Sequence, residues 1–322
     1  MRLFFTRVAL ALMVAGAAYA PSQAGTITFG SGGNQFNMEF VTIGNAGNTA
    51  DTTGSPNPAG AVGYEYGIGK FEVSEDMITK FNASQSLQIT QDNRGTAKPA
   101  TSVSWNEAAR FVNWLNTSTG NQAAYKFTSS GVNDNIDVWQ SGDAGYDVNN
   151  KYRNSLAKYF LPSYNEWYKA AYYDPNTSAY YDYTTGSDSA PTAVASGTTA
   201  GTAVYEFQTG PADVTQAGGL SPYGVMGLGG NVFEWEESSD DLANSSVSSS
   251  RGLRGGGWGD FSLNLSSSAR LNDSPSGENF FVGFRVASLS SSAPPAVPEP
   301  SMMVIGTLFG LGGLMAKRRM KK

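Results

Sequence analysis

Glycine constrains the fold of this chain most, because it occurs 38 times among 322 residues, whereas glycine makes up only about 7% of an average protein. Serine, threonine and asparagine accompany it in polar stretches such as residues 25–60. These residue types favour turns over long helices. A hydrophobic fraction of 40% still allows a buried core. The sequence therefore predicts an irregular, loop-rich globular fold of the α+β class rather than a helix bundle.

The chain contains no cysteine and no histidine. Disulfides, thiolate nucleophiles, zinc-thiolate sites, serine-histidine-aspartate triads and histidine-ligated metals are therefore excluded. Any catalysis must use carboxylates, lysine, tyrosine or serine. Any metal must accept oxygen ligands, which favours calcium or magnesium.

The first 24 residues have the pattern of a secretory signal peptide. Arg2 and Arg7 form a positively charged N-terminal region. An apolar run at 8–18 follows, too short to span a bilayer, and small residues come after it. Cleavage fits after Ala20 or Ala24, and Ala24 is preferred because a proline follows Ala20. We expect an exported protein.

The C-terminus has three parts in order after a Ser/Pro/Ala linker at 288–296. These are Pro298-Glu299-Pro300, an apolar run at 302–316 and a cationic cluster at 317–322. The apolar run is short for a membrane-spanning segment, but flanking cations can extend its reach. Because positive residues stay in the cytoplasm, the bulk of the chain is expected outside.

This tail, residues 297–322, resembles the PEP-CTERM sorting signal of Gram-negative bacteria. The resemblance implies recognition by an exosortase-type sorting protease, a precursor anchored in the inner membrane, and processing near Pro298, Glu299 and Pro300. Release to the cell surface or the extracellular matrix would follow. The alternative is a plain C-terminal membrane anchor.

One globular domain is expected between the two ends, over residues 25–287. Short strands are predicted at 26–30 and 36–44, and a helix is predicted after Ser74. Two further helices begin with the capping-box pattern, one at Ser104 with Glu107 and one at Ser163 with Glu166. These two glutamates are candidate catalytic groups, but capping explains them more simply.

The segment "GGNVFEWEES", residues 229–238, concentrates three carboxylates around two aromatic residues. Its Glu234, Glu236 and Glu237 are consistent with an active site, a metal site or a scaffold. Three arginines, Arg254, Arg270 and Arg285, are candidate partners, because buried charges are rarely left unpaired.

Taken in order, several segments resemble the formylglycine-generating enzyme family, also called the sulfatase-modifying factor domain. They are "GKFEVSEDMITKF", "KPATSVSWNEAARFVNWLN", "LPSYNEWYKAAYYD", "YGVMGLGGNVFEW", "RGLRGGGW" and "SARLNDSP…VGFRVA". The resemblance covers about residues 60–287. It implies a C-type-lectin-like α+β fold with little regular secondary structure.

The resemblance also implies which activities this chain has lost. Family members that make formylglycine use two cysteines, and aerobic members add copper, but the corresponding stretch 258–270 has no cysteine. Relatives that resemble sulfoxide synthases use histidine-ligated iron, and this chain has no histidine. We therefore expect no copper and no iron, and a catalytically silent member of the family.

Calcium is the one family cofactor whose implied ligands are still largely present in this chain. By position, Gly230 and Val232 would supply main-chain carbonyls and Glu234 a carboxylate. A further asparagine ligand of the family falls on Gly227 here, so the implied site lacks one ligand.

The favoured function is a surface or matrix binding protein with extracellular polysaccharide as a candidate partner. Tyrosines in the stretch 171–183 are candidates for stacking on sugar rings. The alternative is an enzyme of altered chemistry, either carboxylate-based on Asp260, Glu234, Glu236 and Glu237 or metal-dependent oxidation as in family relatives. Nucleic acid is not expected, because the terminal segments hold many of the cations and the body between them is more acidic than the net charge of −6.

Overall fold

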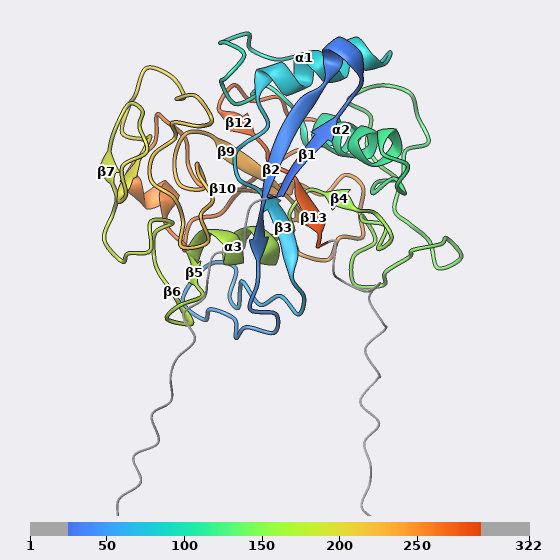
Figure 1. Cartoon of the computed structure of the whole chain (residues 1–322). Helices are drawn as coiled ribbons and strands as arrows, with labels where there is room; N and C mark the ends of the chain where they lie inside the picture. The colour runs from blue at the N-terminus through green and yellow to red at the C-terminus, as the bar shows by residue number, and fades with distance from the viewer. Residues whose placement is uncertain (1–24, 291–322) are drawn as a thin grey trace, which may run out of the picture.

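The computed structural model describes residues 25–290, and its largest sheet has five antiparallel strands (Figure 1). Their spatial order is β1 (Gly25–Phe29), β2 (Phe36–Ile43), β3 (Tyr66–Gly69), β13 (Ala287–Leu289) and β4 (Tyr159–Phe160). Strand β2 largely alternates buried and less buried residues, as a strand with one face on a core does. The first and last strands of the described chain thus belong to the same sheet.

A second sheet of four strands carries the carboxylate-rich segment. Its order is β11 (Leu271–Asp273), β10 (Arg251–Arg254), β9 (Phe233–Ser239) and β12 (Val282–Gly283). Strands β9 and β12 are parallel, and the other pairs are antiparallel. Two small sheets pair β5 (Tyr173–Asp174) with β6 (Ala179–Tyr180) and β7 (Thr192–Ala193) with β8 (Thr202–Ala203). Short 3₁₀ helices occur at Gly32–Asn34 and Ser262–Leu265.

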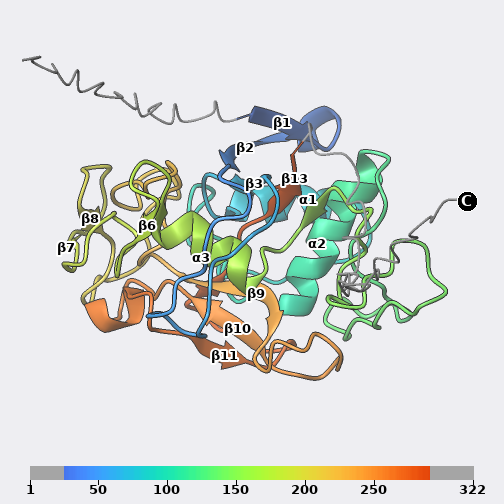
Figure 2. The same cartoon turned by 90° about the horizontal axis from the view of Figure 1, so that it is seen from below.

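Three α-helices complete the fold, α1 (Glu75–Ser84), α2 (Trp105–Ser118) and α3 (Tyr164–Tyr172). Each begins after a serine whose side chain accepts a hydrogen bond from the first turn. The capping boxes predicted for Glu107 and Glu166 are confirmed, since both glutamates also accept a bond from the N-cap backbone. Figure 2 shows α2 and α3 lying between the two larger sheets.

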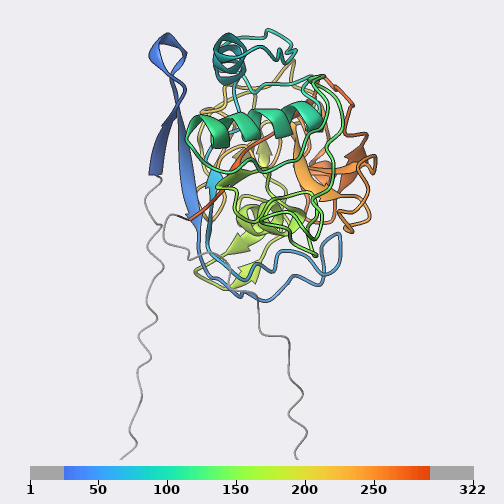
Figure 3. The ribbon, with the colours of Figure 1, turned by 90° about the vertical axis from the view of Figure 1, so that its right-hand side faces the viewer.

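The core joins α2 to both sheets. One cluster combines the apolar face of α2 with residues of β1, β2 and β9, and a second surrounds α3. Two tryptophans also bind across the layers: Trp105 of α2 donates to the carbonyl of Glu236, and Trp235 of β9 donates to that of Val103. The β1–β2 hairpin lies along one edge of the molecule (Figure 3).

One boundary differs from the sequence-based expectation. Strand β13 continues to Leu289, beyond the expected domain end at 287, because Ser288 and Leu289 pair with β3. At the end of β9, Ser238 and Ser239 are buried.

The expected signal peptide at 1–24 and sorting signal at 297–322, with its apolar run at 302–316, lie outside the described residues. Within residues 25–290, no helix combines the length and the apolar character needed to cross a membrane.

Candidate functional site

Glu234 on β9 is held by nitrogen donors. Arg285 donates from Nε to Oε2 (2.6 Å) and from Nη2 to Oε1 (2.5 Å), and the indole of Trp167 donates to Oε2 (2.7 Å). The side chains of Arg285 and Glu234 are both fully buried. The pair therefore connects β9 to the segment before β13 and to α3.

The next two carboxylates of β9 have arginine partners as well. Glu236 accepts from Nε of Arg254 (2.7 Å) and from Nε of Arg270 (2.8 Å). Glu237 accepts from Nε and Nη2 of Arg153, and its closest contact is 2.7 Å. The pairing of Arg254, Arg270 and Arg285 with this strand was predicted from the sequence, whereas Arg153 was not foreseen.

Arg153 bridges two buried carboxylates. Besides Glu237 it binds Glu166 of α3, with Nη1 3.0 Å from Oε1 and Nη2 2.8 Å from Oε2. Burial opposes ionisation, but Arg153 together with hydrogen bonds from Tyr64 and Ser163 holds the pKa of Glu166 below its usual value. Glu166 is thus both a helix cap and half of an ion pair.

These contacts favour the scaffold interpretation of the β9 carboxylates. Each one accepts hydrogen bonds from buried arginine, so none is left as a free general acid or base. Asp260, the other acidic candidate, accepts from the Gly257 amide (2.9 Å) and from Asn264 (2.6 Å). Its side chain closes a local turn.

The calcium site stays a prediction, and its surroundings suit a guanidinium group better than a metal ion. The carboxylate of Glu234 already binds Arg285, whose charge would repel calcium. At Gly227, a side chain would begin 2.5 Å from Oε1 of Glu72, so an asparagine there would require the Glu72 side chain to move. Gly230 has a left-handed backbone (φ +85°), and a side chain there would begin too close to the carbonyl oxygen of Val204.

Burial strongly affects Glu72, which lies beside this cluster. Burial raises the pKa of Glu72 to about 8, against the opposing charge of Arg285. Its Oε1 accepts from Asn231 (2.8 Å), and Oε2 has no hydrogen-bond partner among the described residues.

The stretch 258–270, where the family's cysteines would fall, carries exposed aromatic side chains instead. Phe261 stacks edge-to-face on Phe207, and both rings are mostly exposed. Trp258 is largely buried beneath the guanidinium of Arg94. The segment 258–270 thus carries aromatic rings but no cysteine, the residue type that the resemblance implies at this position.

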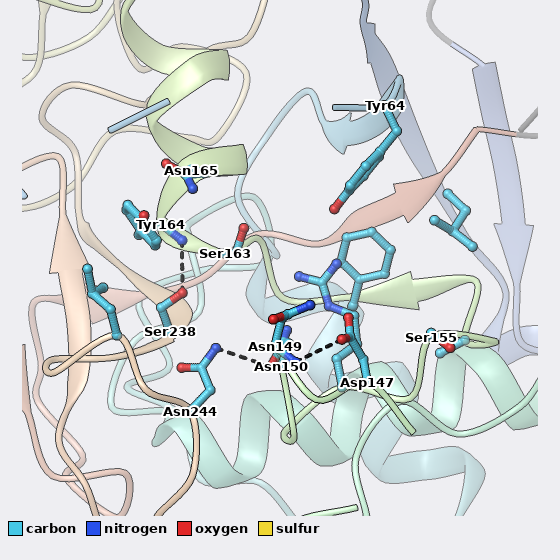
Figure 4. A pocket seen from close by; sticks show the side chains of 15 residues that line it. Tyr64, Asp147, Asn149, Asn150, Ser155, Ser163, Tyr164, Asn165, Ser238 and Asn244 are labelled. Atoms are coloured by element: carbon cyan, nitrogen blue, oxygen red, sulfur yellow. Dashed lines mark hydrogen bonds between the residues drawn. The ribbon is translucent and has the colours of Figure 1, made fainter. Parts of the chain in front are cut away.

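A pocket of about 460 Å³ opens at the Ser239 end of β9, where the segments 147–165 and 238–244 meet Tyr64 (Figure 4). Most of its lining side chains are amides, hydroxyls or aromatic rings. They are Tyr64, Asp147, Asn149, Asn150, Arg153, Ser155, Ala157, Phe160, Ser163, Tyr164, Asn165, Ser238, Leu242, Asn244 and Leu289. A concave site with a few polar groups and aromatic walls is the usual form of a small-ligand site.

Tyr64 forms a rigid wall of this pocket. Its hydroxyl donates to Glu166 (2.6 Å), and its ring packs edge-to-face on Tyr66 at 6.2 Å. Burial of the hydroxyl and the nearby charge of Glu166 raise the pKa of Tyr64 well above its usual value. The residue is nevertheless 42% exposed, so part of its ring faces solvent. In Figure 4, Tyr64 points toward the loop that carries Asp147, Asn149 and Asn150.

Several lining groups keep hydrogen-bonding capacity. The side chain of Asn149 has no recorded partner among the described residues, and Asn165 uses only its carbonyl oxygen, which accepts from the Gly60 amide (2.7 Å). The hydroxyl of Ser238 accepts from the Tyr164 amide (3.1 Å) and can still donate. The pocket therefore presents both donors and acceptors to a ligand.

Two neighbouring asparagines fix the shape of the rim. Asn150 donates to Glu237 (2.5 Å), and Asn244 donates to the side-chain oxygen of Asn150 (3.1 Å). These hydrogen bonds join the loop that carries Asn150 and the loop that carries Asn244 to the end of β9. The pocket is therefore largely preformed.

The sequence indicated neither this pocket nor most of its residues. Its walls come mostly from segments 147–165 and 238–244, which long-range contacts bring together, among them Asn150 with Glu237 and Tyr164 with Ser238. The one available signal was the asparagine-rich stretch "YDVNN" at 146–150, which composition alone marks as a loop.

The tyrosines of 171–183, which the sequence offers as candidates for stacking on sugar rings, are in part packed inside the fold. Tyr172 and Tyr173 are buried, and Tyr180 packs on Tyr168 and Tyr173. Tyr172 and Tyr173 therefore offer no face to a sugar, whereas Tyr180 stays partly exposed.

A family model described as a sulfatase-modifying factor enzyme 1-like domain matches residues 30–289. The chain belongs to this family. The match begins after β1 and ends with the last strand, so nearly all of the described fold belongs to the family domain, as the resemblance in sequence predicted. Among curated proteins, none matches this chain.

Two solved structures share the sulfatase-modifying factor fold with this chain. Treponema denticola variable protein 1 has 20% identity and a TM-score of 0.56, with 84% of this chain and 100% of that one covered. A structure titled CarF has 18% identity and a TM-score of 0.57, with 79% and 98% covered. At these identities the likeness shows the fold alone.

Proposed function

We propose that this sulfatase-modifying factor domain is an exported, catalytically silent binding protein whose pocket beside Tyr64 holds units of an extracellular polysaccharide. The observation that carries the proposal is the pocket itself. An anchored aromatic ring faces free amide and hydroxyl groups, and sugars combine apolar ring faces with many hydroxyls.

Catalytic silence is supported by what the chain lacks and by how its acids are used. No cysteine or histidine is present for the chemistries of the family. Three of the four carboxylates considered for an altered chemistry, Glu234, Glu236 and Glu237, accept from arginines, and the fourth, Asp260, closes a local turn. A binding role therefore has better support than the carboxylate-based enzyme.

Export, sorting by an exosortase and residence at the cell surface or in the matrix remain part of this proposal. Their support is the signal-like sequence at 1–24 and the ordered tail at 297–322. An extracellular polymer and an exported binding domain would meet in the same compartment.

The test is co-sedimentation of the full chain, purified from its own host, with that host's extracellular polysaccharide. Tyr64→Ala should lose most of the retention, because the stacking wall is gone. Tyr64→Phe keeps the ring and should retain binding, although it loses the bond to Glu166. If the wild-type chain stays in solution, or if Tyr64→Ala sediments equally well, the pocket is not the polysaccharide site.

The same experiment in calcium and in EDTA tests the cofactor prediction. Retention that EDTA abolishes would support calcium at Gly230, Val232 and Glu234. Because Glu234 binds Arg285 in the structure, we expect equal retention in the two buffers.

A further inference from the structure

The net charge of the pocket depends on Arg153 and on the carboxylates around it. Arg153 is the only cationic side chain among the described residues that line it, and two carboxylates, Glu166 and Glu237, already bind this arginine. A third carboxylate, Asp147, stands at the rim. The pocket therefore presents an excess of negative charge.

Arg153 is poorly placed to receive an anion. Its side chain is 11% exposed, and its guanidinium lies 3.7 Å from the centre of the Phe160 ring. Nε, Nη1 and Nη2 all donate to Glu166 or Glu237. A ligand carboxylate or phosphate would have to break one of these buried ion pairs, which is costly.

The buried Arg251 does not offset the negative charge at the pocket surface. Arg251 acts on Glu237 electrostatically but is fully buried, packed on the rings of Trp105 and Tyr152, and does not line the pocket. Asp147 remains unopposed at the rim: its Oδ1 accepts from the Asn149 amide (2.9 Å), a neutral donor.

We propose that the pocket selects uncharged sugar units and rejects units that carry carboxylate, sulfate or phosphate groups. This inference rests on the proposed function and names its ligand class. An anionic unit would approach Asp147 and also Arg153, whose positive charge is already exceeded by the charges of Glu166 and Glu237. Repulsion between like charges at short range weakens binding. A neutral unit meets the ring of Tyr64 and the free amides of Asn149 and Asn165 without that repulsion.

The test separates the host's extracellular polysaccharide by anion exchange into a neutral and an acidic fraction. Each fraction is immobilised, and retention of the full chain is measured at low salt, where surface electrostatics are strongest. Retention on the neutral fraction only, lost in Tyr64→Ala, supports the inference. Retention on the acidic fraction, lost in Tyr64→Ala, overturns it and leaves the proposed function standing. Retention on neither fraction overturns both.

A matched pair of variants tests the role of Asp147 itself. Asp147→Asn keeps an acceptor for the Asn149 amide but removes the rim charge. Its retention on the acidic fraction should rise at least about threefold at low salt, an effect of the size expected for one partly exposed charge. Asp188→Asn removes an exposed carboxylate that does not line the pocket, and it should change nothing. Equal retention of both variants would overturn the repulsion by Asp147.

Discussion

Glu234 shows how a residue that reads as a ligand can be structural. Its two oxygens accept from Arg285 and Trp167, and no part of the side chain reaches solvent. A buried ion pair of this kind adds little net stability as a pair, but removing one partner leaves an uncompensated charge.

Glu234→Gln should therefore destabilise the protein by about 3–5 kcal/mol, because Arg285 stays buried without its counter-charge. Urea unfolding measures the difference in the free energy of unfolding. The control is Glu39→Gln, which breaks a half-exposed pair with Lys70 and should cost at most about 1 kcal/mol. A loss at Glu234 no larger than that of the control would contradict the structural role.

The sequence could predict that β9 carboxylates meet arginines, but not which arginine meets which carboxylate. Arg254 and Arg270 share Glu236, while Glu237 takes the unforeseen Arg153 from a distant loop. The choice depends on side-chain directions along β9 and on the placement of loops. Neither has a local sequence signal.

The helices are the elements that the sequence predicts best, because their start signals are local. Ser74, Ser104 and Ser163 cap α1, α2 and α3 as expected. The strands β9 to β12 are short, and their partners are far apart in sequence. Their order in the sheet could therefore not be predicted. The pocket depends on that order and on loops without a periodic pattern, and it was missed for the same reason.

Ser104→Ala should lower the free energy of unfolding by about 1 kcal/mol, because the Glu107 amide at the start of α2 loses its acceptor. Retention on polysaccharide should not change, since α2 does not line the pocket. Thermal unfolding and co-sedimentation check the two parts. Unchanged stability would mean that the cap contributes nothing.

The capping glutamate of α2 gives a pH dependence with a defined sign. Burial raises the pKa of Glu107 to about 7, above its usual value of 4.5. The folded state then holds the proton more tightly, so this residue's contribution to stability falls as the pH rises from about 4.5 to 7.

Glu107→Gln keeps an oxygen for the Ser104 amide and cannot ionise. The free energy of unfolding of the wild type minus that of the variant should therefore decrease over this range of pH, and be flat above it. Urea unfolding at several pH values checks this. A difference that increases with pH would reverse the sign and refute the burial argument.

At the scale of the whole molecule, the fold places two different surfaces at the two ends of β9. One end carries the exposed rings of Phe207 and Phe261, near the position of the family's lost cysteines. The other end carries the preformed pocket of Tyr64 and Asn149. This domain thus combines a frame of paired charges with a pocket that lies at the other end of β9 from the exposed phenylalanines.

The most direct measurement is amide hydrogen exchange of the full chain with and without the neutral polysaccharide fraction. Binding at the pocket should slow exchange in segments 147–155 and 238–244 and leave 205–208 and 258–263 unchanged. Protection confined to 205–208 and 258–263 would place the ligand on the exposed phenylalanines and contradict binding at Tyr64.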